Sequence, residues 1–324
     1  MTAPLDYEAH INRHYTPGDL AEAILAGLRA AGKDPARLGP EDLAPVDQFH
    51  TRGKPATVEL ARAPGMQVLD VGGGLGGPAR TLAAEFGCRV TVLDITREYC
   101  RVGEALTERT GLGERVTFRC ASALDMPFAD ESFDVVRTQH SNMNIGDKER
   151  LYGESRRVLR PGRLLALHEI MAGPNQPPHF PVPWAADPAL SFIRPAADVR
   201  ALIERSGFAE LAFHDQSETA RAWFRERLAS LPGAAAARPA SAARRDVPAG
   251  VRKCIAEPRG GSGYGYRGGV SPTMTKTRRR PRCPRSVSAR RQPLSARYTI
   301  LATCSNCSRS SSPDNAYPTS PSSQ

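Results

Sequence analysis

Short apolar runs and amphipathic stretches alternate along the first two thirds of the chain. Apolar, β-rich runs predict strands that end at Asp70 and Thr138, and further strands at 88–94, at the start of 115–140, at 163–170 and at 207–216. Helical text predicts helices over 18–32, 78–86, 147–162, 197–207 and 218–230. Because strands and helices alternate, the pattern predicts an α/β fold with a doubly wound, Rossmann-like sheet.

The segment 68–77, VLDVGGGLGG, joins the first of these strands to a helix through a glycine-rich loop. Glycines let a ligand touch the main chain, and the N–H groups of the following helix face whatever lies on the loop. The segment therefore predicts a nucleotide-type site. Gly72, Gly74 and Gly77 fit the G-x-G-x-x-G pattern of NAD and FAD enzymes. Asp70 instead favours a ligand with a cationic amino-acid end, such as S-adenosylmethionine.

A second acidic residue, Asp94, ends the predicted strand at 88–94. A carboxylate at this position can accept hydrogen bonds from both ribose hydroxyls of a nucleoside. NAD enzymes use the same device, so Asp94 indicates a ribose without deciding between the two ligands.

Five motifs follow one another in order: VLDVGGGLGG, VTVLD, SALDMPF, SFDVV and RVLRPG. On these motifs, residues 56–170 resemble the class I S-adenosylmethionine-dependent methyltransferases. The likeness is closest to the small-molecule branch of the methyltransferase type 11 domain, which contains ubiquinone and menaquinone biosynthesis enzymes and glycine/sarcosine N-methyltransferases. The resemblance implies S-adenosylmethionine as cofactor, bound without a metal. It implies a cofactor-binding set of Asp70, Gly72, Gly73, Gly74, Gly76, Asp94, Ile95, Ser122, Ala123, Leu124 and Thr138. Ser122 stands where many relatives have an acid that bonds the adenine amine.

The catalytic candidates lie where the fourth predicted strand ends, in RTQHSNMNIGD. Parallel sheets bind ligands at the carboxyl ends of their strands, so Gln139 and His140 should project toward the transferred methyl group. His140 is the candidate base, because imidazole titrates near neutral pH. Its alternative role is a hydrogen bond to the cofactor or the backbone. Candidates for the substrate site are Tyr15 and His50 before the core, and His168, His179 and Trp184 after the fifth strand.

The net charge of +10 is concentrated in the C-terminal segment. Residues 238–324 hold 17 Lys and Arg against 3 Asp and Glu, whereas residues 1–237 hold 27 against 31. This segment is rich in Arg, Pro, Ser and Gly, and we expect it to be disordered. Reading a back-translation of 237–261 one nucleotide over gives helix-like text, which suggests a frameshift near 232–237. We therefore expect the sheet to lack its last strand, leaving 207–216 without its partner and the product destabilised.

The predicted organisation has four parts. Residues 1–55 form a helical lid, 56–170 the cofactor-binding core, 171–237 a substrate-lid loop with a helix and the sixth strand, and 238–324 the basic tail. The sequence has no membrane-spanning stretch and no signal peptide, which favours a cytoplasmic enzyme that acts as monomer or homodimer. The expected partner is a small-molecule methyl acceptor rather than a nucleic acid. Two alternatives stay open: an NAD/FAD-dependent oxidoreductase, and a nucleic-acid binder that uses the basic tail.

Overall fold

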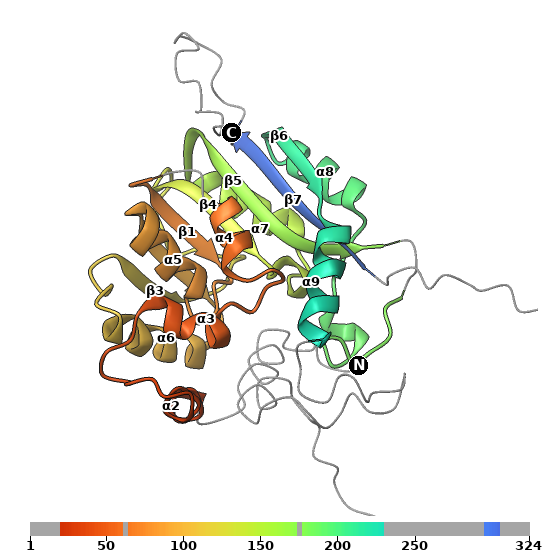
Figure 1. Cartoon of the computed structure of the whole chain (residues 1–324). Coiled ribbons are helices and arrows are strands. Elements are labelled where there is room, and N and C mark those ends of the chain that lie inside the picture. Colours follow the sequence, from red (N-terminus) through yellow and green to blue (C-terminus); the bar gives the residue numbers. More distant parts are fainter. Residues whose placement is uncertain (1–19, 61–63, 174–176, 230–294, 305–324) are drawn as a thin grey trace, which may run out of the picture.

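The computed structural model describes residues 20–60, 64–173, 177–229 and 295–304, which form a central sheet with helices on both faces (Figure 1). The strands are β1 (Gln67–Val71), β2 (Arg89–Asp94), β3 (Val116–Cys120), β4 (Phe133–Gln139), β5 (Leu159–Ala172), β6 (Phe208–Asp215) and β7 (Ser295–Cys304). The helices are α2 (Leu20–Ala30), α3 (Pro40–Asp47), α4 (Lys54–Leu60), α5 (Gly77–Phe86), α6 (Arg97–Arg109), α7 (Lys148–Val158), α8 (Ala196–Arg205) and α9 (Ser217–Ala229). Two short 3₁₀ turns cover Asn142–Asn144 and Pro188–Leu190. None of these described helices is both long and apolar enough to span a membrane.

The strands lie in the order β3-β2-β1-β4-β5-β7-β6. Strands β1 to β5 pair in parallel, and β7 runs antiparallel to both of its neighbours. The predicted α/β, doubly wound sheet is confirmed. The strand order reverses between β1 and β4, where Asp70 pairs with Arg137, so crossovers leave in opposite directions on either side. A crevice for ligands forms at the carboxyl ends of strands at such a switch point.

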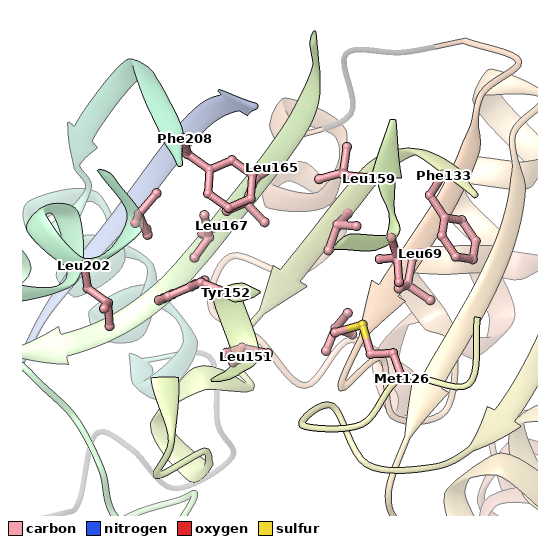
Figure 2. Close-up of a cluster of buried hydrophobic side chains, with 14 of the residues drawn as sticks. Leu69, Met126, Phe133, Leu151, Tyr152, Leu159, Leu165, Leu167, Leu202 and Phe208 are labelled. Carbon is pink, nitrogen blue, oxygen red and sulfur yellow. The ribbon is translucent and has the colours of Figure 1, made fainter. Parts of the chain in front are cut away.

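Alternate side chains of the strands enter two hydrophobic layers. Leu69 of β1 packs with Tyr152 of α7 and Leu202 of α8 on one face of the sheet, and Figure 2 shows this cluster around Leu165 and Leu167 of β5. The neighbouring Val68 faces the other side, toward α5 and α6. Because successive side chains of a strand point to opposite faces, a run that is apolar throughout is what a sheet covered on both faces requires.

The expectation that the sheet lacks its last strand was wrong. Strand β7 lies between β5 and β6, with Thr299 opposite both His168 and His214. Its text, SARYTILATC, contains Tyr298, Thr299, Ile300 and Thr303 and no proline, which gives it a strand propensity that the composition of 238–324 as a whole conceals. β6 therefore has a partner. The expected disorder of these ten residues and the expected destabilisation by an unpaired β6 were both wrong. The proposed frame change near 232–237 lies outside the described residues.

Several boundaries and three helices also differ from the prediction. Helix α7 ends at Val158 rather than at Pro161-Gly162, because the residue before a proline avoids the helical region. Those residues instead form an irregularity in β5, where Leu159 pairs with Phe133 but Leu164 pairs with Val135. Helices α3, α4 and α6 were not predicted.

A buried ion pair fastens α3 to the glycine-rich loop. The Arg80 side chain of α5 is fully buried and donates from Nη2 to Asp47 Oδ2 at 2.8 Å and to the Leu75 carbonyl oxygen at 2.6 Å. Its Nη1 donates to Thr107 Oγ1 of α6 at 2.7 Å. A Cβ on Gly77 would lie 2.5 Å from the Asp47 carbonyl oxygen, so this close approach requires glycine. One guanidinium thus joins α3, the loop and α6.

We expect the Arg80→Met substitution to lower the free energy of unfolding by about 3–5 kcal/mol, because it leaves a buried carboxylate without its partner. Urea denaturation of the full chain measures the change. The matched control is Arg101→Met, which removes an exposed arginine paired with Glu98 and should cost no more than about 1 kcal/mol. Equal losses in the two variants would contradict a structural role for the Arg80 pair.

Candidate active site

The glycine-rich loop leaves β1 in a conformation that side chains would block. Gly72, Gly74 and Gly76 have φ angles of +69°, +57° and +77°, in the left-handed region that favours glycine. A Cβ on Gly72 would also lie 2.4 Å from the Cβ of Ser141, and one on Gly76 would lie 2.6 Å from Cζ of Phe118. The loop can therefore present bare main chain beside the N-terminus of α5, which is the arrangement that a nucleotide-type ligand needs.

Asp70 lies beneath this loop and forms an ion pair with Arg137 in the protein interior. It is 1% exposed, its Oδ1 lies 3.4 Å from Nε of Arg137, and its Oδ2 has no hydrogen-bond partner among the described residues. Burial raises the pKa of the Asp70 carboxyl, while the Arg137 guanidinium acts in the opposite direction. A Cβ on Gly73 would come within 2.9 Å of Oδ2, so the carboxylate sits directly against the loop backbone.

Asp94 connects the loop to the end of β2. Its Oδ2 accepts a hydrogen bond from the Gly74 N–H at 2.9 Å and its Oδ1 accepts one from the Thr96 N–H at 2.8 Å. Near Gly74, the exposed ring of Phe49 stacks on Tyr99, with ring centroids 6.2 Å apart. Two main-chain donors therefore fix the orientation of the Asp94 carboxylate.

The loop after β3 reaches the same corner. The Ala121 N–H donates to the Asp94 carbonyl oxygen at 3.1 Å, and the Ser122 hydroxyl accepts from the Leu124 N–H at 3.2 Å. Ser122, Ala123 and Leu124 are partly buried, as is Ile95, which packs against the cluster of Met143 and Trp184. The structure thus brings together the predicted cofactor residues of the glycine loop, β2 and the loop after β3.

The end of β4 is buried and polar. Thr138 is fully buried, and the Gln139 Oε1 accepts a hydrogen bond from Thr57 Oγ1 of α4 at 3.2 Å and another from Nη2 of Arg137. Arg137 itself is 2% exposed, and burial lowers its pKa. Sequence reasoning missed both Arg137 and Thr57. Arg137 follows the apolar text FDVV, and nothing in the local pattern indicates that it pairs with Asp70.

Three histidines meet where β4 ends beside β5: His140 follows β4, His168 lies within β5, and His50 comes from the connection between α3 and α4. His140 has a φ of +55°, its N–H donates to the His168 carbonyl oxygen at 3.0 Å, and the two rings stack with centroids 5.2 Å apart at 10°. Thr51 Oγ1 lies 3.2 Å from Nε2 of His140 and 3.4 Å from Nε2 of His168. The His50 ring lies edge-on to both, with centroid distances of 6.2 and 6.4 Å.

The surroundings of His50 hold its ring in the neutral form. Its Nε2 lies 2.9 Å from the Gly53 carbonyl oxygen, to which it donates. Burial, together with the nearby positive charge of Arg137, lowers the pKa of His50 to about 3. It is therefore neutral at physiological pH and orients its neighbours rather than accepting a proton.

The turn after His140 is held by a buried acid. Glu169 is 1% exposed and accepts hydrogen bonds from the Ser141 and Asn142 N–H groups at 3.4 and 3.2 Å. Burial raises the pKa of Glu169 to about 7 and lowers that of Lys148 to about 8. The Lys148 ammonium donates to the Asn142 carbonyl oxygen at 2.6 Å. These contacts fix the backbone that carries His140.

The remaining substrate candidates are dispersed. Trp184 is buried, and its Nε1 donates to the Ser191 hydroxyl at 3.0 Å. His179 is exposed, and Tyr15 lies outside the described residues. Within the described ranges no group of three or more His, Cys, Asp or Glu side chains is arranged to hold a metal ion. The site is thus built from loop backbone, carboxylates and imidazoles.

Comparison with known proteins gives one domain match and many relatives. Residues 69–167 match the family described as methyltransferase domain. The chain is 33% identical over 159 residues to methyltransferase GfsG of Streptomyces halstedii, covering 48% of this chain and 57% of that protein. It is 43% identical over 108 residues to sterol 24-C-methyltransferase ERG6B of Gibberella zeae, covering 33% and 28%. The matches therefore span between about a quarter and just over half of these two relatives.

Among solved structures, the geranyl diphosphate C-methyltransferase of Streptomyces coelicolor A3(2) superposes with a TM-score of 0.59 at 17% identity, over 94% of this chain and all of that one. At this identity the likeness shows the fold alone. The comparisons thus identify a match to a methyltransferase domain over residues 69–167, and the superposition shows that the chain shares the fold of that enzyme.

Proposed function

We propose that this chain transfers the methyl group of S-adenosylmethionine to a nitrogen, oxygen or carbon nucleophile of a small molecule. The observation that carries the proposal is the hydrogen bond that joins the end of β2 to the glycine loop at the switch point of the sheet. There the Asp94 carboxylate accepts the N–H of Gly74. The methyltransferase domain match favours this function over the two alternatives that the sequence left open.

The described residues fit the cofactor. The segment from Gly72 to Gly76 presents main chain without side chains where the methionine end would bind, and its close packing against Ser141, Val92 and Phe118 requires glycine at three of these positions. Asp94 would hold the ribose, and Ser122 to Leu124 would line the adenine. Asp70 is 1% exposed and paired with Arg137, which supports a role beneath the loop, where it shapes the backbone, rather than direct contact with the ammonium group. When bound, the cofactor supplies an electrophilic methyl group on a sulfonium.

Methyl transfer is an in-line displacement in which the leaving sulfur needs no acid, so the protein contributes positioning and exclusion of water. A base is needed when the nucleophile carries a proton. His140 is our candidate for it, since it is partly exposed at the end of β4 while His50 and His168 are buried. Gln139 is held by Thr57 and Arg137 and would position the acceptor. His168 and Trp184 are further candidates for the acceptor site.

The location and assembly of the protein stay predictions from the sequence: a cytoplasmic enzyme, monomeric or homodimeric, without a nucleic-acid partner. Roles for Tyr15 and His179 in substrate binding stay predictions in the same way.

We expect the full chain to bind S-adenosylhomocysteine and the Asp94→Ala variant to bind it about ten- to a hundredfold more weakly, because a charged hydrogen-bond acceptor for the ribose is lost. Isothermal titration calorimetry measures both constants. Asp130→Asn, which alters an exposed carboxylate paired with Arg157, serves as the control and should bind like the wild type. Saturable binding of NADH with none of S-adenosylhomocysteine would refute the proposal.

A screen of amines, phenols and quinol precursors for methyl release identifies an acceptor, after which His140→Asn can be tested. We expect kcat to fall by about 10²- to 10⁴-fold, the usual contribution of a positioned base, and to lose its rise across the histidine titration range. His214→Asn, on the exposed side of β6, should keep the wild-type pH profile. An unchanged profile for His140→Asn would assign the residue to hydrogen bonding alone.

A further inference from the structure

A single hydroxyl lies between the two stacked histidines. Thr51 is 4% exposed and stands between α3 and α4, and its Oγ1 is 3.2 Å from Nε2 of His140 and 3.4 Å from Nε2 of His168. The three groups come from separate segments of the chain: His140 directly follows β4, His168 lies within β5, and Thr51 lies in the connection before α4. The buried Thr51 hydroxyl therefore links the Nε2 atoms of the two imidazole rings.

The hydroxyl imposes opposite roles on the two rings. Thr51 has one proton to donate and lone pairs with which to accept. If it donates to one Nε2, its other contact is made as an acceptor, and the second Nε2 must carry a hydrogen. His140 and His168 are therefore complementary: one presents Nε2–H to Thr51 while the other presents a lone pair. This arrangement fixes the tautomers of both rings at once.

We propose that Thr51 and His168 form a proton relay behind His140, which accepts the proton released by the methyl acceptor. The relay rests on the proposed methyl transfer. The acceptor X–H gives its proton to Nδ1 of His140 as X bonds the methyl carbon, and the carbon–sulfur bond breaks with its electron pair left on sulfur. His140 passes its Nε2 proton to the Thr51 oxygen, and Thr51 passes its hydroxyl proton to Nε2 of His168. The products are X–CH₃, the neutral thioether and one imidazolium, so protons and charge balance.

Stacking limits the pair to one added proton. With ring centroids 5.2 Å apart, two imidazolium cations would repel in a site that excludes water. Other charged or titratable groups act on the cluster: Glu59 of α4, with its partner Arg52, Arg137 of β4, and His50, whereas Glu169 of β5 lies on the opposite side, against the Ser141 and Asn142 N–H groups. Of these, Glu59 interacts electrostatically with His168 and offers a negative charge toward the end of the relay.

The relay narrows the class of acceptor. A base with an outlet for its proton serves a nucleophile that releases a hydrogen ion, such as a phenol, another hydroxyl, an amine or an acidic carbon. A nucleophile without such a hydrogen, such as a thioether, would make no use of it. We therefore infer an acceptor that loses a proton from the methylated atom, from an O–H, an N–H or an acidic C–H group.

The test compares Thr51→Val, which keeps the shape but removes the hydroxyl, with Thr51→Ser, which keeps the hydroxyl. Imidazole NMR of the full-length protein without ligand follows the titration of both rings, assigned with His140→Gln and His168→Gln. In the wild type and Thr51→Ser, we expect the Nε2 signals of both rings to respond within one shared titration. In Thr51→Val the complementary tautomers of the two rings should be lost, so that their Nε2 signals no longer respond together, at an unchanged melting temperature.

The kinetic arm uses an O–H or N–H acceptor from the screen. We expect Thr51→Val to lower kcat about tenfold or more with KM unchanged and to shift its pH profile, and Thr51→Ser to restore both. Wild-type titrations and profile in Thr51→Val would overturn the relay. The NMR arm needs no turnover, so a shared titration in a protein that binds no S-adenosylhomocysteine would refute the proposed function while leaving the coupling of the two rings in place.

Discussion

The site depends on one buried ion pair. Arg80 and Asp47 are both almost fully buried, and the same guanidinium holds the Leu75 carbonyl of the glycine loop and Thr107 of α6. Moving two charges out of water costs free energy that offsets most of their mutual attraction. This pair therefore fixes the geometry of the segments that it joins more than it adds net stability. It holds the end of α3 against the core, and the next ten residues carry His50, Thr51 and Thr57 to the ends of β4 and β5.

Those ten residues add polar groups that contact Gln139, His140 and His168 at the nucleotide-binding edge of the sheet. The parallel strands by themselves bring only Gln139, His140 and His168 near one another. Thr57 adds a hydrogen bond to Gln139, and Thr51 adds contacts to His140 and His168. On the opposite side, Glu169 and Lys148 fix the turn that gives His140 its left-handed backbone. A non-glycine residue in that conformation costs free energy, and it persists here because contacts from both sides determine it.

The sequence was sufficient where the signal is local. The glycine loop and Asp94 lie within single strand–loop units, and the helical and strand periodicities there are strong, so their places were predicted correctly. Arg137, Thr51 and Thr57 could not be found in this way. The partners that place them in the site, Asp70, His168 and Gln139, lie between 67 and 117 residues away in the chain, and a lone arginine or threonine has no pattern of its own. Strand β7 was missed for the opposite reason, because the composition of a long segment concealed a short stretch of residues that favour strands.

The electrostatics of the cluster bear on how methyl transfer gains rate. Arg137 is paired with Asp70 and Lys148 lies by Glu169, so the buried charges near the end of β4 largely offset one another. In such a water-excluded region, an anionic nucleophile and a sulfonium attract strongly, and their reaction removes both charges. Forming that anion in bulk water would surround it with a hydration shell that must then be stripped. A base that takes the proton inside the site, and a neighbour that accepts it in turn, creates the anion only where the sulfonium already lies.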